Sequence, residues 1–402
     1  MFNIAILGMG VVGGGVYEVL KNNAADISKK LGGNGETLVT VKHVLDRRSF
    51  EGHDLASIVT TDFQKILDDK SVSVVVETMG GAHPAFDFSK AALESGKSVV
   101  TSNKEVVAKY GDILLETAKR NNVCYLYEAS VGGGIPVISP LLNCLTANKI
   151  ERIAGILNGT TNYILTKMLF EGEAFDTALK SAQALGYAEA DPTADVAGLD
   201  ALRKICILGG IAFGKHIPTE KAAICEGITE IDKKDIAAAS KAGYSVKLLG
   251  VAEKVEDKAY LMVAPHLVKN GTQIASTVDV FNAVSVKGNM VGELVFYGAG
   301  AGSLPTASAV VSDILSAIKC PVPETPRENC GDGFCLEAKE MPVKIYFRTD
   351  APACELCGEI IELGDGERAV ITEVATYGSH CAALDALKAK NYKILARHFV
   401  LK

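Results

Sequence analysis

The sequence lacks tryptophan, is poor in aromatic residues and carries no excess of positive charge. Aromatic residues make up 6% of the chain, and 41 lysine and arginine residues stand against 48 aspartate and glutamate residues, for a formal net charge of −7. Binding to a nucleic-acid backbone needs a basic surface, so this balance argues against a nucleic-acid partner. No uninterrupted apolar run reaches the roughly 18 to 20 residues of a membrane-spanning helix, so we expect no membrane partner.

Signals for secretion are also missing. The chain passes straight from Met1 into a strand-like run, without the charged region and apolar core of a signal peptide. Its ten cysteines stand at irregular spacings. In a reducing compartment such cysteines are usually small buried apolar residues rather than disulfide partners. We therefore expect a cytoplasmic protein with free thiols.

The first third of the chain alternates short apolar runs with helical patterns. Because strands that alternate with helices form βαβ units, this pattern predicts an α/β fold with a parallel sheet. The runs cover residues 4–7, 41–45, 72–76, 98–101 and 123–127. From about residue 151 the pattern becomes that of an α+β domain, and a helix is predicted at about 305–318. With 402 residues, the chain is long enough for two or three domains.

A glycine-rich loop follows the first apolar run. Gly8, Gly10 and Gly13 form G-x-G-x-x-G between a strand and a helix. The first glycine permits a tight turn, the second lets the backbone approach a pyrophosphate, and the third lets the helix pack on the strand. Glycine triplets also occur in plain strand-to-helix connections, but this position favours dinucleotide binding.

The end of the second strand gives two conflicting signals about the cofactor. Asp46 is placed to hydrogen-bond the ribose 2′-hydroxyl of NAD, whereas Arg47 and Arg48 could hold the 2′-phosphate of NADP. A solvated charged turn is the simpler alternative. The sequence therefore leaves NAD and NADP open.

Lys104 follows the strand predicted at residues 98–101. Ligands of open parallel sheets bind at the carboxyl ends of the strands, which favours a functional role for this lysine. Ser102 and Glu105 offer a structural alternative, a capping box in which Lys104 is merely an early helix residue.

A second lysine stands in a group of carboxylates. Asp200 and Lys204 are four residues apart and therefore on one helical face, shortly after Glu189, Asp191 and Asp195. This spacing is also that of an ordinary surface ion pair. The apolar residues that follow Lys204 favour a desolvated ammonium, and desolvation lowers the pKa of a lysine until it becomes a usable acid or base.

These residues resemble the homoserine dehydrogenase signature. Ala182, Gly186, Tyr187, Ala188, Asp191, Pro192, Asp195, Val196, Gly198, Asp200 and Lys204 stand at its spacing. The nucleotide loop and residues 77–81, 103–104, 128–136, 155–161 and 298–306 resemble the same family in the same order, so the resemblance covers roughly residues 1–320. It implies reversible NAD- or NADP-dependent interconversion of L-homoserine and L-aspartate 4-semialdehyde in threonine and methionine biosynthesis.

The resemblance also implies roles for individual residues. Lys204 resembles the catalytic acid/base, and Lys104 resembles a second active-site lysine. The implied substrate site comprises Glu189, Asp200, Asp195, Gly186 and Thr160, and the implied cofactor site Gly8, Gly10, Val11, Val12, Gly13, Asp46, Arg47, Arg48, Lys104 and Gly302. Homoserine is a zwitterion, so carboxylates suit its ammonium, and a hydroxyl or lysine suits its carboxylate.

A monovalent-cation site is implied where the family's two main domains join. Glu128 with the backbone of Val131, Gly133 and Ile135 is similar to a site for Na⁺ or K⁺ in this family. Carboxylate and carbonyl oxygens are suitable ligands for a hard cation. The alternative is a glycine-rich hinge without a chemical role.

The expected organisation has three domains. A Rossmann-type dinucleotide-binding domain covers residues 1–130 and is completed by a helix at 303–320, and an α+β catalytic and dimerisation domain covers 131–302. We expect a homodimer or a dimer of dimers, with strands between about 246 and 297 pairing across a two-fold axis. A linker is expected at 321–340, because the segment 320–333 is rich in proline, glutamate, asparagine and glycine. It leads to a module at 341–402.

The C-terminal module resembles the ACT type. Strand-like residues 343–347, 369–374 and 394–401 and a helix at 379–389 suggest an ACT-like α+β fold. The usual helix start after the first strand is replaced by residues 351–363, so we expect weak or no inhibition by threonine. Cys354 and Cys357 in this segment could form a metal site or a redox pair, but no second pair at zinc-ribbon spacing accompanies them.

Two other functions remain as alternatives. A Rossmann enzyme that oxidises an aldehyde through a cysteine nucleophile would need an activated thiol, but Cys124, Cys144 and Cys206 stand in apolar contexts where thiols are inert. A non-catalytic amino-acid sensor on the same scaffold would bind an effector without turnover. The full set of active-site residues argues against this second alternative.

Overall fold

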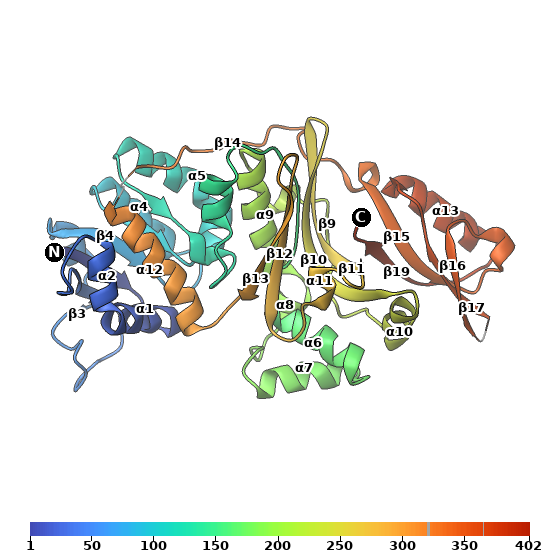
Figure 1. The fold of residues 1–402 in the computed structure, drawn as a ribbon, viewed down its shortest axis with the longest axis horizontal. Helices are drawn as coiled ribbons and strands as arrows, with labels where there is room; N and C mark the ends of the chain where they lie inside the picture. The colour runs from blue at the N-terminus through green and yellow to red at the C-terminus, as the bar shows by residue number, and fades with distance from the viewer. Residues whose placement is uncertain (320–321, 365) are drawn as a thin grey trace. The chain divides into compact units, whose positions relative to one another are not determined.

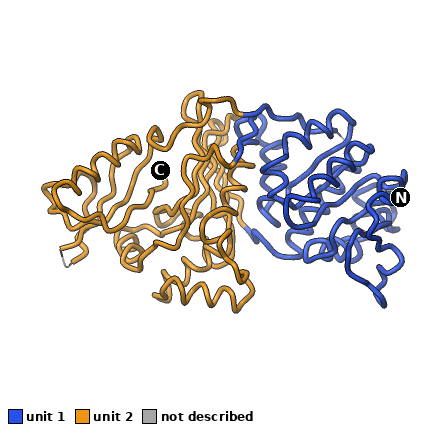
Figure 2. The backbone as a smooth tube through the Cα atoms, turned by 180° about the vertical axis from the view of Figure 1, so that it is seen from behind, with its two compact units in different colours: residues 1–147, 210–218, 298–329 blue, residues 148–209, 219–297, 330–402 orange. Residues whose placement is uncertain are grey.

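The computed structural model describes residues 1–319, 322–364 and 366–402. The chain divides into two compact units, drawn in different colours in Figure 2. Unit 1 comprises residues 1–147, 210–218 and 298–329, and unit 2 comprises residues 148–209, 219–297 and 330–402. Among the described residues, no helix is both long enough and apolar enough to cross a membrane.

Unit 1 is built on a parallel sheet in the order β3-β2-β1-β4-β5-β6. Its strands are β1 (Phe2–Leu7), β2 (Val39–Leu45), β3 (Val59–Thr60), β4 (Val72–Glu77), β5 (Ser98–Thr101) and β6 (Tyr125–Leu126). The five strands predicted for this region are present, although β6 is shorter than predicted, and β3 is additional. The chain order reverses between β1 and β4, so the carboxyl ends of these strands form the usual ligand-binding edge of a doubly wound sheet.

Helices cover this sheet, and one of them comes from late in the chain. The helices are α1 (Val11–Asn22), α2 (Ala24–Lys30), α3 (Gln64–Asp68), α4 (Ala85–Glu94), α5 (Lys104–Arg120) and α12 (Ser303–Lys319), with short turns η1 (Glu128–Ser130) and η2 (Pro140–Cys144) and a small pair β8 (Lys215–His216) and β14 (Glu328–Asn329). Figure 1 shows α12 beside α1. A Cβ at Gly15 in α1 would lie 2.8 Å from the carbonyl oxygen of Ser303, so glycine permits this close approach. The helix predicted at 305–318 is therefore present and belongs to unit 1.

Unit 2 is built on a mixed sheet in the order β13-β12-β7-β10-β11-β19-β15-β17-β16, with β9 paired to β11 and β18 to β15. The strands are β7 (Ile150–Ile156), β9 (Ile224–Cys225), β10 (Tyr244–Val255), β11 (Lys258–Lys269), β12 (Phe281–Gly288), β13 (Gly292–Ala299), β15 (Pro342–Thr349), β16 (Glu359–Gly364), β17 (Glu367–Ile371), β18 (Ala375–Thr376) and β19 (Ile394–Val400). The remaining helices and turns are α6 (Gly159–Phe170), α7 (Phe175–Ala184), α8 (Thr193–Val196), α9 (Leu199–Phe213), η3 (Thr219–Lys221), α10 (Lys233–Lys241), α11 (Gln273–Ser276), η4 (Ala338–Glu340), η5 (Ala353–Glu355) and α13 (Tyr377–Ala389).

The C-terminal part of the chain shares a sheet and a core with the rest of unit 2. β19 pairs in parallel with β11, which links the two parts of the sheet. One core cluster contains Leu249 and Met262 together with Met341, Ile345 and Phe399. The sequence predicted a separate module from residue 341, whereas these contacts place it within unit 2.

The predicted linker makes buried contacts with unit 1. The hydroxyl of Tyr127 donates to Glu324 Oε2 at 3.1 Å, and Arg327 Nη2 donates to the same hydroxyl at 2.6 Å and pairs with Glu324. Burial raises the pKa of Glu324, so its pairing with Arg327 offsets a desolvation cost. Residues 320 and 321, at the end of the predicted helix and the start of the predicted linker, lie outside the described residues.

Candidate functional site

The nucleotide loop has the geometry that its glycines predict. Gly8 has φ of +89°, and a Cβ at Gly13 would lie 2.1 Å from the carbonyl oxygen of Gly8. Helix α1 begins at Val11, so its free N–H groups and the positive end of its dipole face the loop. Thr78 Oγ1 donates to the Gly8 carbonyl oxygen at 2.7 Å and fixes the turn to the end of β4.

A cavity of about 730 Å³ adjoins this loop within unit 1. Its lining includes Gly8, Gly10, Asp46, Arg47 and Arg48, so the structure brings together five of the ten predicted cofactor residues. The remaining wall comprises Leu45, Thr61, Thr78, Met79, Gly80, His83, Pro84 and Phe88. Apolar and polar groups are thus both available to an adenosine moiety.

Asp46 and Arg48 form an ion pair, and both also make hydrogen bonds to the backbone of Met9 in the glycine-rich loop. Asp46 Oδ2 accepts a hydrogen bond from the Met9 N–H at 2.8 Å, and Arg48 Nη2 donates to Asp46 Oδ2 at 2.7 Å and to the Met9 carbonyl oxygen at 2.6 Å. Hydrogen bonds from Arg48 hold the pKa of Asp46 well below its usual range. Both arginines are exposed on the cavity wall, but the hydrogen bonds to Asp46 and Met9 come from Arg48. The two arginines are therefore not equivalent, which the sequence did not indicate.

Lys104 is the first residue of α5, and the cap before it is Asn103. Asn103 Oδ1 accepts hydrogen bonds from the N–H groups of Glu105 and Val106 at 3.2 Å each, so the capping box between Ser102 and Glu105 is wrong. Asn103 Nδ2 also donates to the Gly81 carbonyl oxygen at 2.8 Å. Lys104 therefore stands at the end of β5, at the carboxyl edge of the sheet, as predicted.

Glu77, at the carboxyl end of β4, is a buried acid that the sequence analysis did not single out. Its Oε2 accepts from Thr101 Oγ1 at 2.6 Å, and its Oε1 accepts from the Met79 N–H at 2.7 Å. Burial raises the pKa of Glu77 to about 7. Because Thr78 and Met79 line the cavity, Glu77 supports the wall of the nucleotide site.

Gly302 lies in the loop before α12, with φ of +123°. The next residue, Ser303, donates from Oγ to the carbonyl oxygen of Val11 at 2.8 Å. The loop that carries Gly302 is thereby attached to the start of α1 and the glycine-rich turn. This contact brings together another pair of predicted cofactor residues, Val11 and Gly302.

Lys204 is buried within unit 2 and makes two strong hydrogen bonds. Its Nζ donates to Asp200 Oδ2 at 2.8 Å and to the carbonyl oxygen of Leu157 at 2.7 Å. Both side chains are less than one tenth exposed, at 9% for Lys204 and 5% for Asp200. The i,i+4 pair predicted on one helical face is confirmed, and its burial distinguishes it from a surface ion pair.

Asn158 connects this pair to a second carboxylate. Its Nδ2 donates to Asp200 Oδ2 and to Asp195 Oδ1, both at 2.8 Å, and its Oδ1 caps α6 by accepting from the Thr161 N–H. Asn158 is not among the site residues predicted from the sequence. Its position between a strand and an apolar helix is typical of an N-cap, but its contacts with Asp195 and Asp200 depend on the tertiary fold.

A hydrogen bond connects Thr160 to the turn that contains Gly186, whereas Glu189 is exposed to solvent. Thr160 Oγ1 donates to the carbonyl oxygen of Tyr187 at 2.5 Å, which fixes the turn at Gly186 to the start of α6. Gly186 has φ of +76°, which favours glycine. Glu189 is exposed. Asp191 caps α8 from outside the helix, since its Oδ1 accepts from the N–H of Thr193, and Pro192 is the cap residue rather than the first helical residue.

The predicted cation site is a tight loop around a buried carboxylate. Glu128 Oε1 accepts from the N–H groups of Val137 and Ile138 at 2.7 and 2.8 Å, and Oε2 accepts from the Ser139 N–H at 2.6 Å. Gly133 has φ of +56°, and a Cβ there would lie 2.4 Å from the carbonyl oxygen of Gly300. A carboxylate has about four lone-pair sites, so three N–H donors leave one of them open on Glu128. Carboxylate and carbonyl oxygens are the ligand types that fit a hard monovalent ion.

The nine cysteines that the structure describes give no sign of a nucleophile. Cys124 and Cys206 are buried, and burial raises the pKa of Cys206 far above its usual range. Cys144 is exposed, so its predicted apolar context is wrong. Cys354 and Cys357 are exposed free thiols, and no cluster of three or more histidine, cysteine or acidic side chains suited to a metal ion occurs among the described residues.

The predicted residues therefore form two groups in separate units. The glycine loop, Asp46, Arg47, Arg48, Lys104, Gly302 and the Glu128 loop belong to unit 1, whereas Thr160, Gly186, Glu189, Asp195, Asp200 and Lys204 belong to unit 2. The first group suits a dinucleotide. The second offers a buried ammonium beside carboxylates, which suits proton transfer to or from a zwitterionic alcohol.

Comparison with known proteins gives a consistent result. A family model described as homoserine dehydrogenase matches residues 136–315, and one described as homoserine dehydrogenase, NAD binding domain, matches residues 8–128. The chain is 45% identical to the homoserine dehydrogenase of Neisseria gonorrhoeae over 316 residues, which are 78% of this chain and 71% of that protein. It is 34% identical to that of Lactococcus lactis over 398 residues, which are 93% of this chain and 92% of that protein.

Solved structures are similar over all or most of the chain. A homoserine dehydrogenase from Thiobacillus denitrificans has a TM-score of 0.91 at 36% identity and is matched over 100% of this chain and 98% of that chain. A hyperthermophilic archaeal homoserine dehydrogenase in complex with NADPH has a TM-score of 0.67 at 28% identity, over 80% of this chain and 99% of that chain.

Proposed function

Because the chain belongs to the homoserine dehydrogenase family, we propose that Lys204 is the proton carrier in the interconversion of L-homoserine and L-aspartate 4-semialdehyde. The observation that supports this role is the burial of its ammonium between Asp200 and the Leu157 carbonyl group. In the reductive direction the ammonium donates a proton to the alkoxide that forms at the substrate. In the oxidative direction the neutral amine accepts the hydroxyl proton.

The bound nicotinamide supplies the other half of the chemistry, as hydride acceptor or donor. We assign the substrate's ammonium to the carboxylates of Asp195, Asp200 and Glu189, because charge-assisted hydrogen bonds favour this pairing. Asn158 keeps Asp195 and Asp200 in place. Lys104 lies at the carboxyl edge of the unit 1 sheet. We assign it as a second active-site lysine that contacts the substrate and the nicotinamide. Turnover of homoserine with either dinucleotide, followed by absorbance, tests this proposal.

We propose that the enzyme uses both NADP and NAD, with Arg47 as the residue that favours NADP. Both arginines are exposed and line the cavity, but Arg48 is bound by Asp46 and Met9 and shapes the loop for either cofactor. Arg47→Ala should weaken NADP binding by on the order of 1 to 3 kcal/mol and leave NAD binding nearly unchanged. Arg48→Ala should weaken both cofactors. Fluorescence titration of the reduced cofactors measures this, and equal loss of NADPH and NADH in Arg47→Ala would contradict the assignment.

We propose a monovalent cation, Na⁺ or K⁺, on the Glu128 carboxylate and the carbonyl groups of Val131, Gly133 and Ile135. Replacing sodium and potassium chloride by tetramethylammonium chloride at constant ionic strength should lower the stability of the protein by roughly 1 to 3 kcal/mol, since a ligand bound to the folded state stabilises it. Thermal melts and turnover should recover saturably as either ion is added. Identical melts in all three salts would exclude the site.

We propose a homodimer, or a dimer of dimers, formed through the unit 2 sheet. β13 is an edge strand of this sheet. Tyr297 on β13 is 59% exposed and stacks on Phe281 of the neighbouring β12, so the edge presents an aromatic surface. Sedimentation velocity should show no stable monomer at micromolar concentration, and Tyr297→Asp should release monomers, whereas Met290→Asp in the β12–β13 turn should not. An active wild-type monomer would refute the dimer.

We also propose that residues 341–402 form an ACT-like regulatory module and that the protein works in the cytoplasm. The order β19-β15-β17-β16 with α13 is the strand order of a βαββαβ module that has lost its first helix. The free thiols among the described cysteines suit a reducing compartment.

A further inference from the structure

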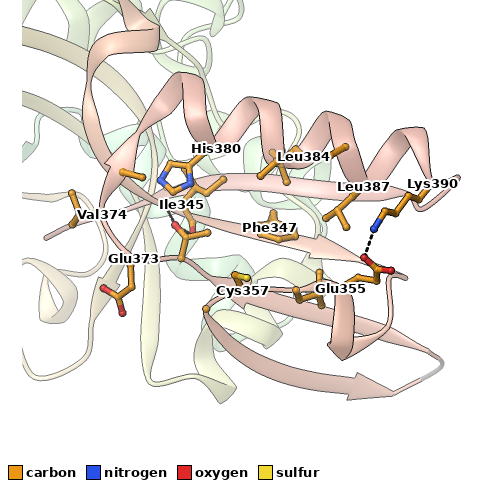
Figure 3. Close-up of a pocket in the computed structure, with 16 residues that line it drawn as sticks. Ile345, Phe347, Glu355, Cys357, Glu373, Val374, His380, Leu384, Leu387 and Lys390 are labelled. Carbon is orange, nitrogen blue, oxygen red and sulfur yellow. Dashed lines mark hydrogen bonds and ion pairs between the residues drawn. The ribbon is translucent and has the colours of Figure 1, made fainter.

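A buried lysine on β10 stands apart from the residues assigned to the substrate. Lys247 is 1% exposed, and its Nζ donates to Asn162 Oδ1 at 3.1 Å and to the carbonyl oxygen of Thr277 at 2.5 Å. Lys390 offers a contrast, because its side chain is 55% exposed and pairs with Glu355, as Figure 3 shows. The two acceptors that the structure describes for Lys247 are both uncharged.

Burial of this amine has a free-energy cost that an apolar residue would not have. A charged group loses its hydration when it is buried, and a carboxylate partner would offset part of that loss. Burial lowers the pKa of Lys247 to about 8, so most molecules still carry the ammonium at neutral pH. A methionine would fill much of the same space without this cost. The placement of Lys247 therefore indicates a role that depends on its hydrogen bonds.

Lys247 and Asn162 together attach α6 to the segment 277–281. Asn162 lies near the start of α6, and its Nδ2 donates to the carbonyl oxygens of Thr277 at 3.3 Å and Phe281 at 3.1 Å. An ammonium group donates hydrogen bonds and accepts none, so Lys247 requires Oδ1 of the Asn162 amide and leaves Nδ2 for the segment. The lysine thereby fixes the orientation of this amide and the contacts that the amide makes.

Two other contacts hold the same segment against α6. Thr166 Oγ1 accepts a hydrogen bond from the N–H of Asp279 at 3.0 Å. A Cβ at Gly159 would lie 2.6 Å from the carbonyl oxygen of Val280, so the backbone at the start of α6 contacts the segment closely. A displacement of residues 277–281 would therefore be transmitted directly to the first turn of the helix.

The start of α6 also carries groups of the proposed substrate site. The cap residue, Asn158, donates to Asp195 Oδ1 and to Asp200 Oδ2, both at 2.8 Å. Thr160 Oγ1 donates to the carbonyl oxygen of Tyr187 at 2.5 Å and holds the turn beside it. The positions of both carboxylates and of this turn therefore depend on where the first turn of α6 lies.

We propose that Lys247 is a positioning residue for the substrate site, which it serves by holding the start of α6 against residues 277–281. This inference rests on the proposed substrate site. Lys247 acts through Asn162 and the helix, and it neither touches the substrate nor exchanges a proton with it. Hydrogen bonds are directional and specify one place for the helix start, which apolar contacts alone do not.

Lys247→Met is expected to raise the KM for homoserine at least about tenfold and to lower kcat less than about threefold, because displaced binding groups weaken substrate binding before they affect proton transfer by Lys204. The affinity for reduced dinucleotide, measured by fluorescence titration, should not change, since its assigned residues belong to unit 1. Lys254→Met is the matched control, because Lys254 is a partly exposed lysine of the same strand, and should keep normal kinetics. An unchanged KM in a folded Lys247→Met variant would overturn the proposal.

Asn162→Leu tests the route from Lys247 to the helix. It removes the acceptor of the lysine and the donor to the segment, so the KM for homoserine should again rise at least about tenfold. In the double variant Lys247→Met/Asn162→Leu, the increase in KM should be no larger than the greater single effect, because the two residues act in series. Increases that multiply in full would show independent actions and contradict the proposal.

Thermal melts separate positioning from stability. Each single variant leaves a buried polar group without its partner, whereas the double variant replaces both groups by apolar ones. The double variant should therefore melt closer to the wild type than either single variant and still show the raised KM. A KM that recovers together with the melting temperature would reveal a purely structural role and refute the proposal, as would a double variant that does not fold. Absence of homoserine turnover in the wild type would instead count against the proposed function.

Discussion

Replacing Lys204 by methionine is expected to lower turnover by roughly 100-fold or more in both directions, because the variant lacks the proton carrier. Methionine retains much of the buried stem's packing, so the fold should persist. Steady-state turnover of homoserine and of aspartate 4-semialdehyde measures the effect. The affinity for reduced dinucleotide, whose assigned residues belong to unit 1, should stay close to that of the wild type.

A neighbouring substitution controls for general damage to α9. Arg203→Met changes an adjacent, partly exposed basic residue of the same helix and should keep most of the activity. Asp200→Asn should reduce turnover too, because it removes the carboxylate that contacts the lysine. Near-normal turnover by a folded Lys204→Met variant would rule out Lys204 as the proton carrier.

Ending the chain after Gly333 is expected to prevent stable folding of unit 2. The truncation removes Met341, Ile345, Phe347 and Phe399 from a core that they share with Met262. Loss of each large apolar contact costs about 1.5 to 3 kcal/mol, so the four together cost about 6 to 12 kcal/mol, which is comparable with the 5 to 15 kcal/mol that typically stabilise a protein. Soluble yield and circular dichroism melts of the truncated chain test this.

The sequence alone led to the opposite expectation for this truncation. Proline and glycine at 320–333 are typical of a boundary that few contacts cross, and composition alone would therefore predict that a chain ending near 333 folds and remains active. The structure shows β19 paired with β11 and a shared core, neither of which local composition can indicate. A soluble truncated chain with normal turnover would restore the first expectation.

Local patterns predicted the parts of the site that depend on local spacing. The strand–glycine–helix pattern predicted the turn at Gly8, and the i,i+4 spacing placed Asp200 and Lys204 on one face. The homoserine dehydrogenase resemblance then assigned the chemistry. Fold class was predictable for the same reason, because strand and helix periodicity in the first third of the chain is strong.

Contacts between distant segments could not be predicted in this way. Asn158 reaches Asp195 and Asp200 across about 40 residues of sequence, and no local signal distinguishes it from an ordinary helix cap. The difference between Arg47 and Arg48 arises from a contact with Met9, 39 residues away from Arg48.

The most direct test of the central claim is a spectrophotometric assay of the purified full chain with L-homoserine and NADP or NAD. The account predicts homoserine-dependent formation of the reduced cofactor at 340 nm, reversal with aspartate 4-semialdehyde, and no requirement for phosphate or added thiol. A folded protein that binds the dinucleotide and shows no homoserine-dependent absorbance change with either cofactor would contradict it.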